Sequence, residues 1–316
     1  MISLASALIH VDGLSVRYGD RSALDHLSFE VQAGELVGLL GPNGAGKTTT
    51  LSVLATLQRP DDGRVRVAGY DVVRDAPRVR AVLGLVPQTL AIYPTLTARE
   101  NLLFFARLFH LRDVRSVAHD SLRLVGLEDR ADDIVATFSG GMQRRLNLAC
   151  GLLHEPRVVL LDEPTVGVDP QSRERIFAAV RGQASRGAAI LYSTHHMEEA
   201  ERLCDRVVLI DGGRVVAAGS PADLIERAGG GLRIELRTHA PLQTGWLDTV
   251  RGARILEWAP GAVDGHVIRV SLDDLSLAAR VLDCAAVGGT GVVDFHLHRP
   301  SLQDVFLTFT GHALRD

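Results

Sequence analysis

The sequence has almost no lysine. Of its 34 lysine and arginine residues, only Lys47 is a lysine, so arginine supplies nearly all of the positive charge. An arginine side chain ends in a broad, planar guanidinium, whereas a lysine side chain ends in a compact ammonium on a flexible stem. A single lysine among so many arginines indicates a site where only the smaller cation fits.

Cysteine is also scarce and is not arranged for metal binding. Cys150, Cys204 and Cys284 are odd in number, far apart in the chain and without the short spacings of zinc ligands. We therefore expect each of them to be a small buried apolar residue and not a reactive thiol. This pattern excludes a disulfide framework as the basis of the fold.

Long apolar runs and excess positive charge are both missing. No apolar stretch approaches the ~18 residues that a membrane-spanning helix needs. Residues Met1 to Asp12 lack the basic start and apolar run of a signal peptide. The formal net charge of −4 argues against a general nucleic-acid-binding protein, which needs cations for the phosphate backbone. We therefore expect a cytosolic protein with no nucleic acid partner.

Length and residue pattern predict an α/β protein of about two domains. The chain has 316 residues, of which 46% are hydrophobic and 23% charged. Residues 8 to about 90 favour strands, residues 97 to 153 favour helices, and strands and helices alternate again from Val158 to about Ala218. This order predicts a parallel-sheet core with a helical insert at about 91–153. Thr97 with Glu100, Gly126 and Ser139 are expected to cap helices of the insert.

The last part of the chain predicts a second, smaller domain. A helix is expected to end at Arg227, and the glycines that follow it are typical of a linker. Residues Leu232–Arg237, Val267–Leu272 and Val292–His298 alternate between apolar and polar side chains, as half-buried strands do. We therefore predict one domain at 1–227 and a small α+β domain at 228–316, in which no motif indicates chemistry.

One motif matches the phosphate-binding pattern G-x-x-x-x-G-K-[ST], and it contains the lone lysine. An apolar run, Leu36–Leu40, precedes it, and a helix is expected from Thr48 to Leu57. Strand, glycine-rich loop and helix present backbone N–H groups and a positive helix end to phosphate. Lys47 is expected to reach the β- and γ-phosphates of a nucleoside triphosphate, and Thr48 to ligate Mg²⁺. The loop consists of Gly41, Pro42, Asn43, Gly44, Ala45, Gly46, Lys47 and Thr48, and is followed by Thr49.

Two adjacent acids end the apolar run that begins at Val158. A buried parallel strand that stops at Asp162 and Glu163 places both carboxylates at the carboxyl edge of the sheet, where α/β proteins bind ligands. Asp162 is expected to hold Mg²⁺ and Glu163 to polarise an attacking water molecule. Apolar residues followed by Asp-Glu are common, so this interpretation depends on the phosphate motif earlier in the chain.

A second candidate phosphate site precedes the acidic strand. Ser139 can cap a helix from Met142 to Leu153, and Gly140 and Gly141 let the backbone approach a phosphate closely. One nucleotide bound to one monomer does not explain two phosphate-binding helix starts. The alternative is an ordinary helix cap that follows a loose turn.

With these motifs in order, residues 8 to about 227 resemble the ATP-binding subunits of ABC transporters. The resemblance implies an ABC-type P-loop ATPase core of the α/β class, a helical insert subdomain, and ATP and Mg²⁺ as ligands. In the family's terms, Tyr18 stacks on adenine, and Gln88 contacts the metal ion and the water molecule. His195 senses the γ-phosphate and Asp169 lies in the dimer-contact loop.

The stretch Ser139-Gly140-Gly141 matches the family signature LSGGQ, with two departures. Phe138 replaces its leucine and Met142 replaces its glutamine, so the side chain of that glutamine has no counterpart here. The resemblance implies a head-to-tail dimer of two copies, in which Ser139, Gly140, Gly141 and Asp169 contact the ATP held by Lys47 of the other copy.

Two further segments resemble one class within the family. Arg299 to Leu307 is similar to the end of the daunorubicin-resistance type of ATP-binding subunit, and Tyr93 to Leu102 fits the same exporters. Those subunits pair with separate ABC-2-type export permeases. The resemblance thus implies an ATP hydrolase that powers efflux of a drug or other small molecule from the cytoplasmic face of the cell membrane, where its permease partner holds it.

Two alternatives remain open from the sequence. The first is the ATP-binding subunit of an importer or of a lipid or polysaccharide exporter. The second is a soluble ABC ATPase of DNA repair or translation, which typically needs long coiled coils or two tandem ATPase halves that are missing here. The transported substrate contacts the permease and leaves no pattern in this chain.

Overall fold

The computed structural model describes residues 7–228, 231–239, 245–260, 266–287 and 291–310. Contacts between residues divide the chain into two units, and the boundary between them lies between Pro221 and Ala222. The helix Pro221–Arg227 (α8), which the sequence analysis placed at the end of the first domain, falls almost entirely in the second unit.

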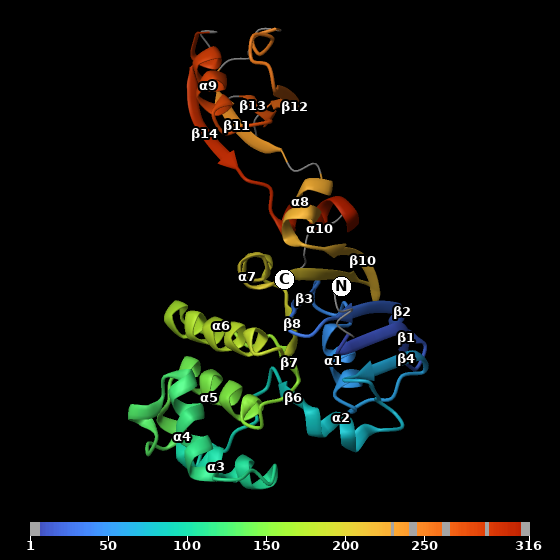
Figure 1. Ribbon diagram of the computed structural model, residues 1–316. Coiled ribbons are helices and arrows are strands. Elements are labelled where there is room, and N and C mark those ends of the chain that lie inside the picture. The colour runs from blue at the N-terminus through green and yellow to red at the C-terminus, as the bar shows by residue number, and fades with distance from the viewer. Residues whose placement is uncertain (1–6, 229–230, 240–244, 261–265, 288–290, 311–316) are drawn as a thin grey trace, which may run out of the picture. The chain divides into compact units, whose positions relative to one another are not determined.

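A six-stranded sheet forms the centre of the first unit (Figure 1). Its order is β10-β9-β3-β8-β7-β6, and all neighbours are parallel except β9 and β10. β3, β7 and β8 are buried along their whole length, as expected for apolar strands covered on both faces. The strands are β3 (Leu36–Leu40), β6 (Leu83–Val86), β7 (Val158–Asp162), β8 (Ala189–Thr194), β9 (Arg206–Asp211) and β10 (Arg214–Gly219).

The parallel sheet was predicted, but its last strand differs from the prediction. β10 returns antiparallel to β9 through a two-residue turn at Gly212 and Gly213. Both glycines have positive φ (52° and 79°), the backbone conformation that a tight hairpin of this kind requires.

A second sheet of the first unit is antiparallel, with the order β2-β1-β4-β5. Its strand β1 runs from Ile9 to Tyr18 and continues through a register irregularity after Val11. One apolar core joins this sheet, the helix α1 (Lys47–Leu54) and the six-stranded sheet. The antiparallel strands are β1 (Ile9–Tyr18), β2 (Arg21–Val31), β4 (Asp62–Val67) and β5 (Tyr70–Asp71).

The helical insert forms a core of its own, in which α3, α4 and α5 pack together (Figure 1). The predicted caps are confirmed. Thr97 and Glu100 form a capping box, Gly126 ends α4 in the left-handed conformation, and the Ser139 side chain accepts the N–H of Met142. The helices of this unit are α2 (Ala76–Val82), α3 (Ala98–Leu108), α4 (Val114–Val125), α5 (Gly140–Leu152), α6 (Pro170–Ser185) and α7 (Met197–Leu203), with 3₁₀ turns at Glu128–Arg130 and Val135–Thr137.

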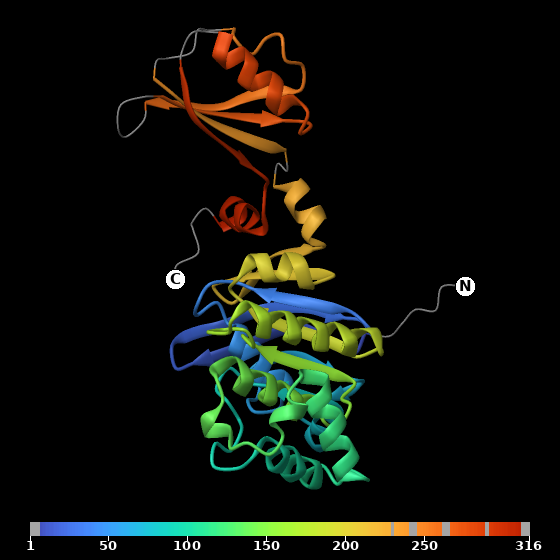
Figure 2. The same ribbon diagram turned by 90° about the vertical axis from the view of Figure 1, so that its left-hand side faces the viewer.

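The second unit contains an antiparallel sheet of order β12-β13-β11-β14, and α9 (Leu277–Val287) shares its apolar core (Figure 2). The predicted strands are present as β11 (Leu232–Thr238), β13 (His266–Leu272) and β14 (Val292–His298). β12 (Ala253–Pro260) was missed, because a bulge between Ile255 and Glu257 breaks its alternation. The last described helix is α10 (Leu302–Thr310).

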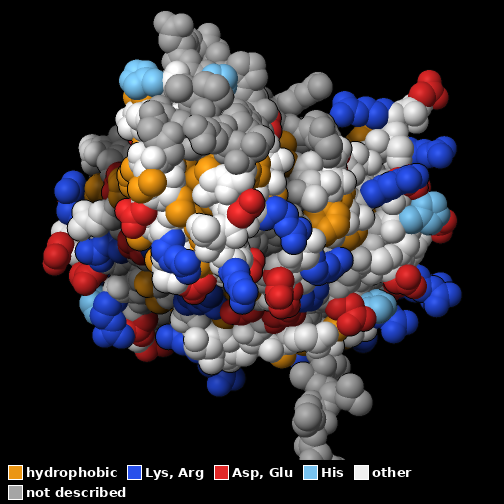
Figure 3. Space-filling model, turned by 90° about the horizontal axis from the view of Figure 1, so that it is seen from above, with side chains coloured by type: hydrophobic (Ala, Val, Ile, Leu, Met, Phe, Trp, Pro, Cys, Tyr) orange, Lys and Arg blue, Asp and Glu red, His pale blue; other side chains and the backbone are white. Residues whose placement is uncertain are grey.

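The surface carries charges of both signs. On the face that Figure 3 views, arginine side chains lie among carboxylates and scattered apolar side chains. Among the described residues, no helix is both long enough and apolar enough to span a bilayer.

Candidate functional site

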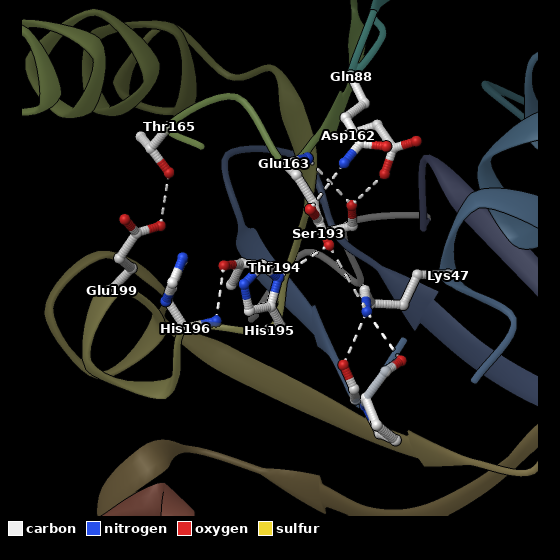
Figure 4. Close-up of polar contacts among 12 residues, drawn as sticks. Lys47, Gln88, Asp162, Glu163, Thr165, Ser193, Thr194, His195, His196 and Glu199 are labelled. Atoms are coloured by element: carbon white, nitrogen blue, oxygen red, sulfur yellow. Dashed lines mark hydrogen bonds and ion pairs between the residues drawn. The ribbon is translucent and has the colours of Figure 1, made fainter. Parts of the chain in front are cut away.

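The carboxyl ends of three neighbouring strands bring the predicted site residues together. The phosphate loop follows β3, Asp162 and Glu163 end β7, and Ser193 to His195 end β8. Figure 4 shows these side chains converging at one edge of the sheet. The sequence alone predicted each segment, and the strand order β3-β8-β7 places all three side by side.

The loop from Gly41 to Gly46 is shaped by glycine. Gly44 and Gly46 have φ values of 81° and 106°. A Cβ atom at Gly41 would lie 2.2 Å from the carbonyl oxygen of Ile210, so the loop can follow this path only without a side chain there. The loop ends where α1 begins at Lys47, with Thr48 exposed and Thr49 half-buried in the first turn.

Lys47 is buried and turned toward its own loop. Its Nζ atom donates hydrogen bonds to the carbonyl oxygens of Gly41 at 2.7 Å and Pro42 at 3.0 Å, and lies 3.7 Å from Oε1 of Glu163. Burial lowers the pKa of Lys47, and the nearby carboxylates of Glu163 and Asp162 oppose that shift. A phosphate anion beside the Lys47 ammonium would further oppose the lowering of its pKa.

Glu163 is the centre of a set of polar contacts (Figure 4). Its Oε1 atom lies 3.0 Å from Nδ1 of His195, and its Oε2 atom accepts a hydrogen bond from Nε2 of Gln88 at 3.0 Å. Glu163 as a whole is 7% exposed. Two side chains from separate loops thus fix both oxygens of one buried carboxylate.

The backbone of Glu163 is strained. Its φ is 46°, a left-handed conformation that is uncommon for a residue other than glycine. Its N–H donates to the carbonyl oxygen of Ser193 at 3.1 Å, which ties the residue to the end of β8. Strain of this kind costs about 1–3 kcal/mol and persists where the surroundings fix it, often at active sites.

The residues expected to hold Mg²⁺ have the right chemistry for it. Asp162 is buried and accepts a hydrogen bond from the Ser193 hydroxyl at 2.6 Å, so its second oxygen is left for another partner. Mg²⁺ prefers hard oxygen ligands and combines one or two carboxylates with water and substrate phosphates. The carboxylate of Asp162, the hydroxyl of Thr48 and the amide oxygen of Gln88 fit that preference.

Tyr18 lies at the end of β1 with its side chain largely in solvent. It is 55% exposed, and its hydroxyl donates to Oε1 of Gln58 at 2.6 Å. An exposed aromatic ring held through its hydroxyl is suited to stacking on a planar base.

The Ser139-Gly140-Gly141 motif begins α5 and packs against the start of α6. A Cβ atom at Gly141 would lie 2.6 Å from Oδ2 of Asp169 and from Oγ of Ser172, so the close approach requires glycine. Asp169 caps α6 and accepts the N–H of Ser172 at 2.9 Å, a bond that lowers the pKa of its carboxyl. No described hydrogen bond or ion pair joins these residues to Lys47 or Glu163.

A buried polar cluster beside the site was not predicted. Oε2 of Glu199, on α7, accepts hydrogen bonds from the hydroxyls of Thr165 and Tyr192, each at 2.8 Å. The three side chains come from the loop after β7, from β8 and from α7, and all are buried. Figure 4 shows the hydrogen bond between Thr165 and Glu199. Glu199 follows the exposed Glu198 in the first turn of α7, so only the fold reveals that the second of the two acids is buried.

Arg144 was also missed. Its guanidinium donates to the backbone carbonyl of Gln88, and so holds the loop that carries the catalytic glutamine candidate. Arg144 follows the Ser139-Gly140-Gly141 motif on α5. Arg144 has another arginine, Arg145, as its neighbour in the helix, and nothing in the sequence indicates which of the two contacts the Gln88 loop.

Comparison with known proteins identifies the family. The family model described as ABC transporter matches residues 24–166. The linearmycin resistance ATP-binding protein of Bacillus subtilis is 36% identical, with 98% of this chain and 100% of that protein covered. A daunorubicin resistance ATP-binding protein of Streptomyces coeruleorubidus is 40% identical, with 99% and 98% covered.

A solved structure gives the same result for the fold. A dimeric ATP-binding cassette in a post-hydrolysis state, bound to ADP and Pi, aligns with a TM-score of 0.61 and 25% identity over 67% of this chain and 98% of that chain. These matches and the site define a P-loop ATPase. The chain belongs to the ABC transporter family, as an ATP-binding and ATP-hydrolysing subunit. The predicted family and fold class are therefore confirmed.

Proposed function

We propose that this ATPase powers a small-molecule exporter through a separate membrane permease. The observation that carries the proposal is the buried carboxylate of Glu163, which Gln88 and His195 hold on two sides and which lies beside Lys47. This arrangement is suited to hydrolysis of a nucleotide and not to binding alone. The two resistance proteins of similar sequence support export as the use of that hydrolysis.

The residues have separate roles in the proposed reaction. The loop from Gly41 to Gly46 binds the phosphates through backbone N–H groups, and Lys47 moves from its loop carbonyls to the β- and γ-phosphates. Glu163 accepts a proton from the attacking water molecule. His195 contacts the γ-phosphate, and Gln88 orients the water molecule. Tyr18 stacks on adenine.

Mg²⁺, when bound, neutralises charge on the outer phosphates. Thr48, Asp162 and Gln88 would hold it. The Ser193 hydroxyl orients Asp162 for this task, because the hydrogen bond between them fixes one carboxylate oxygen.

The proposed unit is a head-to-tail dimer. Ser139, Gly140 and Gly141 of one copy would contact the ATP bound by Lys47 of the other, with Asp169 at the contact. The dimeric cassette of similar fold supports this arrangement. So does the position of the motif at a helix start that makes no described polar contact with its own Lys47.

The permease is proposed to dock at an apolar groove between the insert and the core. The groove has a volume of about 260 Å³ and includes Leu57, Leu85, Ala91, Phe105 and Phe109 in its lining. Leu57 is 69% exposed and Phe109 is 37% exposed, so the groove presents apolar surface to a partner. Ala91 is three residues from Gln88. A short helix of the permease bound here would therefore lie close to the loop that carries Gln88, whose side chain holds Glu163.

Residues 1–227 are proposed to carry out catalysis, and residues 228–316 to have an accessory role. The dimer is proposed to act at the cytoplasmic face of the cell membrane, where the permease would hold it. The kind of substrate is proposed only as a drug or other small molecule, because the permease binds it.

Leu57→Glu tests the proposal when the chain is reconstituted with a permease that supports transport by the wild-type chain. ATP hydrolysis by the isolated chain should stay unchanged, while transport should be lost because a charge fills the apolar groove. Leu108→Glu is the matched control, since Leu108 is 60% exposed on α3 and does not line the groove. Transport that survives Leu57→Glu would contradict the docking site, and an isolated wild-type chain that does not hydrolyse ATP would contradict the function.

A further inference from the structure

The strand β14 leaves one edge of the small sheet open. It pairs with β11 on one side, and no described strand pairs with its other side (Figure 1). The N–H of Phe295 donates to Oδ1 of Asp294, its own neighbour in the chain, at 2.8 Å. In an antiparallel pair, residues alternate between facing the partner strand and facing away. The N–H and C=O of Phe295 therefore point to the open edge.

One face of β14 carries apolar side chains that are only partly covered. Phe295 lies opposite Leu236 and Leu297 opposite Ile234 on β11, and both β11 residues have no exposed surface. Phe295 is nevertheless 48% exposed and Leu297 36% exposed. The apolar core thus reaches the open edge and stops there uncovered.

The other face of the sheet carries a row of alternating acidic and basic side chains. The row crosses all four strands, and its neighbours are Glu257 with Arg269, Arg269 with Glu235, and Glu235 with His296. Arg269 forms ion pairs with both Glu257 and Glu235. The row ends at the open edge on a histidine, and a carboxylate is the group that would continue it.

The next row has the opposite order of charges. Arg237 on β11 lies beside Asp294 on β14, so this row ends at the open edge on a carboxylate. Oδ2 of Asp294 also lies 3.2 Å from Nε2 of His296 in the same chain. The open edge therefore presents a carboxylate and a histidine on either side of Phe295.

We propose that β14 pairs antiparallel with β14 of a second copy of this chain, about a two-fold axis at Phe295. The N–H and C=O groups of Phe295 in the two copies then bond each other, and the two small sheets become one sheet of eight strands. Such a contact is isologous, because the same surface serves in both copies. It also removes the exposed edge that an unpaired strand presents.

The axis at Phe295 fits the side chains on both faces. It sets Asp294 of each copy opposite His296 of the other, so in each row an acidic side chain meets a basic one. Across the joined sheet, one such row contains Glu235 and His296 of one copy and then Asp294 and Arg237 of the second copy. On the apolar face the two Phe295 rings meet, and Leu297 lies opposite Val293, which is 58% exposed. No register shifted by one residue pairs the charges in this way.

Two charge variants, alone and mixed, test this pairing in the full chain without nucleotide. Asp294→Arg sets arginine opposite histidine in a homodimer, and His296→Glu sets glutamate opposite aspartate, so each variant alone should lose self-association. In a mixture, the arginine introduced in one variant lies opposite the glutamate introduced in the other, and the remaining His296 and Asp294 still face each other. The mixture should therefore form a heterodimer.

Sedimentation velocity measures association of these variants, and affinity tags on the two chains identify the heterodimer. Variants that self-associate like the wild type, or a mixture that stays monomeric, would overturn the proposal.

A second pair of variants tests the apolar face. Phe295→Asp should abolish nucleotide-free association, because it places two carboxylates at the axis. Val287→Asp should leave association unchanged, since Val287 is 88% exposed on α9 and lies off the strand edge. ATP binding by every variant, measured by calorimetry, checks that the fold is intact. A wild-type chain that is monomeric without nucleotide at every concentration would also rule the pairing out.

Discussion

The Nζ atom of Lys47 lies 3.7 Å from Oε1 of Glu163, and both side chains are buried. The cation expected to bind phosphate and the carboxylate expected to activate water are thus ion-pair partners. In the proposed reaction the phosphates replace the carbonyl oxygens of Gly41 and Pro42 and the carboxylate of Glu163 as partners of Lys47. We expect the same change to leave the Glu163 carboxylate free to accept a proton from water.

Glu163→Gln should keep ATP binding and lower turnover at least ~100-fold, within the range for loss of a general base. Affinity for ATP should not fall, because the amide no longer competes with phosphate for Lys47. In the proposed dimer the variant should also remain associated in MgATP, since opening follows hydrolysis. ATPase assays and size-exclusion chromatography with and without MgATP measure these effects.

A nearby glutamate provides the control for that variant. Glu198 lies in the first turn of α7, is exposed and faces solvent, so Glu198→Gln should hydrolyse ATP like the wild type. Wild-type turnover by Glu163→Gln would remove Glu163 from the mechanism.

Ser139→Arg should abolish hydrolysis and leave nucleotide binding by the single subunit unchanged. The motif is proposed to serve the ATP of the other copy, so a bulky side chain blocks closure of the dimer and not the first capture of ATP. Calorimetry should show binding close to that of the wild type, and Ser185→Arg, on the exposed end of α6, should change neither property. If Ser139→Arg weakened binding as much as Lys47→Ala, the head-to-tail arrangement would be wrong.

Glu199→Ala should destabilise the first unit. The substitution removes the acceptor that the buried hydroxyls of Thr165 and Tyr192 share, and an unsatisfied buried polar group costs about 1–3 kcal/mol. Glu199→Gln keeps an acceptor oxygen and should cost less. Urea unfolding measures both variants against Glu198→Ala. Equal stability of all three variants would show that the cluster contributes nothing.

Two of the three cysteines should be unreactive in the folded protein. Burial raises the pKa of the Cys150 and Cys204 thiols, because a thiolate is poorly solvated in an apolar core, whereas Cys284 is half-buried. A thiol reagent at pH 8 should modify Cys284 first and the other two only in denaturant. Rapid modification of Cys150 in the native protein would contradict the structure.

The same shifts give a pH dependence of stability. The folded-state pKa values of Cys150 and Cys204 lie above the ordinary thiol value, so only the unfolded chain releases these protons as the pH rises past about 8.5. Above that pH, ionisation of the two thiols in the unfolded chain should lower the free energy of unfolding. Below that pH the two thiols should have no effect on it. The fall measured by urea unfolding should be smaller in Cys150→Ala than in the wild type.

The predictable parts of this fold are those that local chemistry determines. The apolar run Leu36–Leu40 and the caps at Thr97, Gly126 and Ser139 depend on neighbours in the sequence, and the structure has all of them. β12 was not predicted, because a bulge disrupts its alternation of apolar and polar residues. Helix α1 ends at Leu54 and not at Leu57, since Thr56 has a φ of 62°.

The site was predictable in its segments and not in its contacts. Motifs located Lys47 and Glu163, but the sequence does not show that the two side chains are ion-pair partners. The positive φ of Glu163 also depends on its bond to the end of β8, a strand distant in sequence. Glu199 was missed for the same reason, because its partners Thr165, in the loop after β7, and Tyr192, on β8, are distant from it in sequence and meet it only in the fold.

The lone lysine allows a direct test of the phosphate site. Apart from the α-amino group, Lys47 is the only primary amine in the chain, so an amine-reactive reagent followed by peptide mapping reads one side chain. Burial lowers the pKa of Lys47, so at any given pH a larger fraction of its amine is in the reactive neutral form. Bound MgATP should place phosphate oxygens on the ammonium, raise its pKa and exclude the reagent. Labelling should therefore fall sharply with MgATP and shift to higher pH, while labelling of Met1 stays constant. AMP lacks both outer phosphates and should protect little, and equal labelling of Lys47 with and without saturating MgATP would contradict the phosphate site.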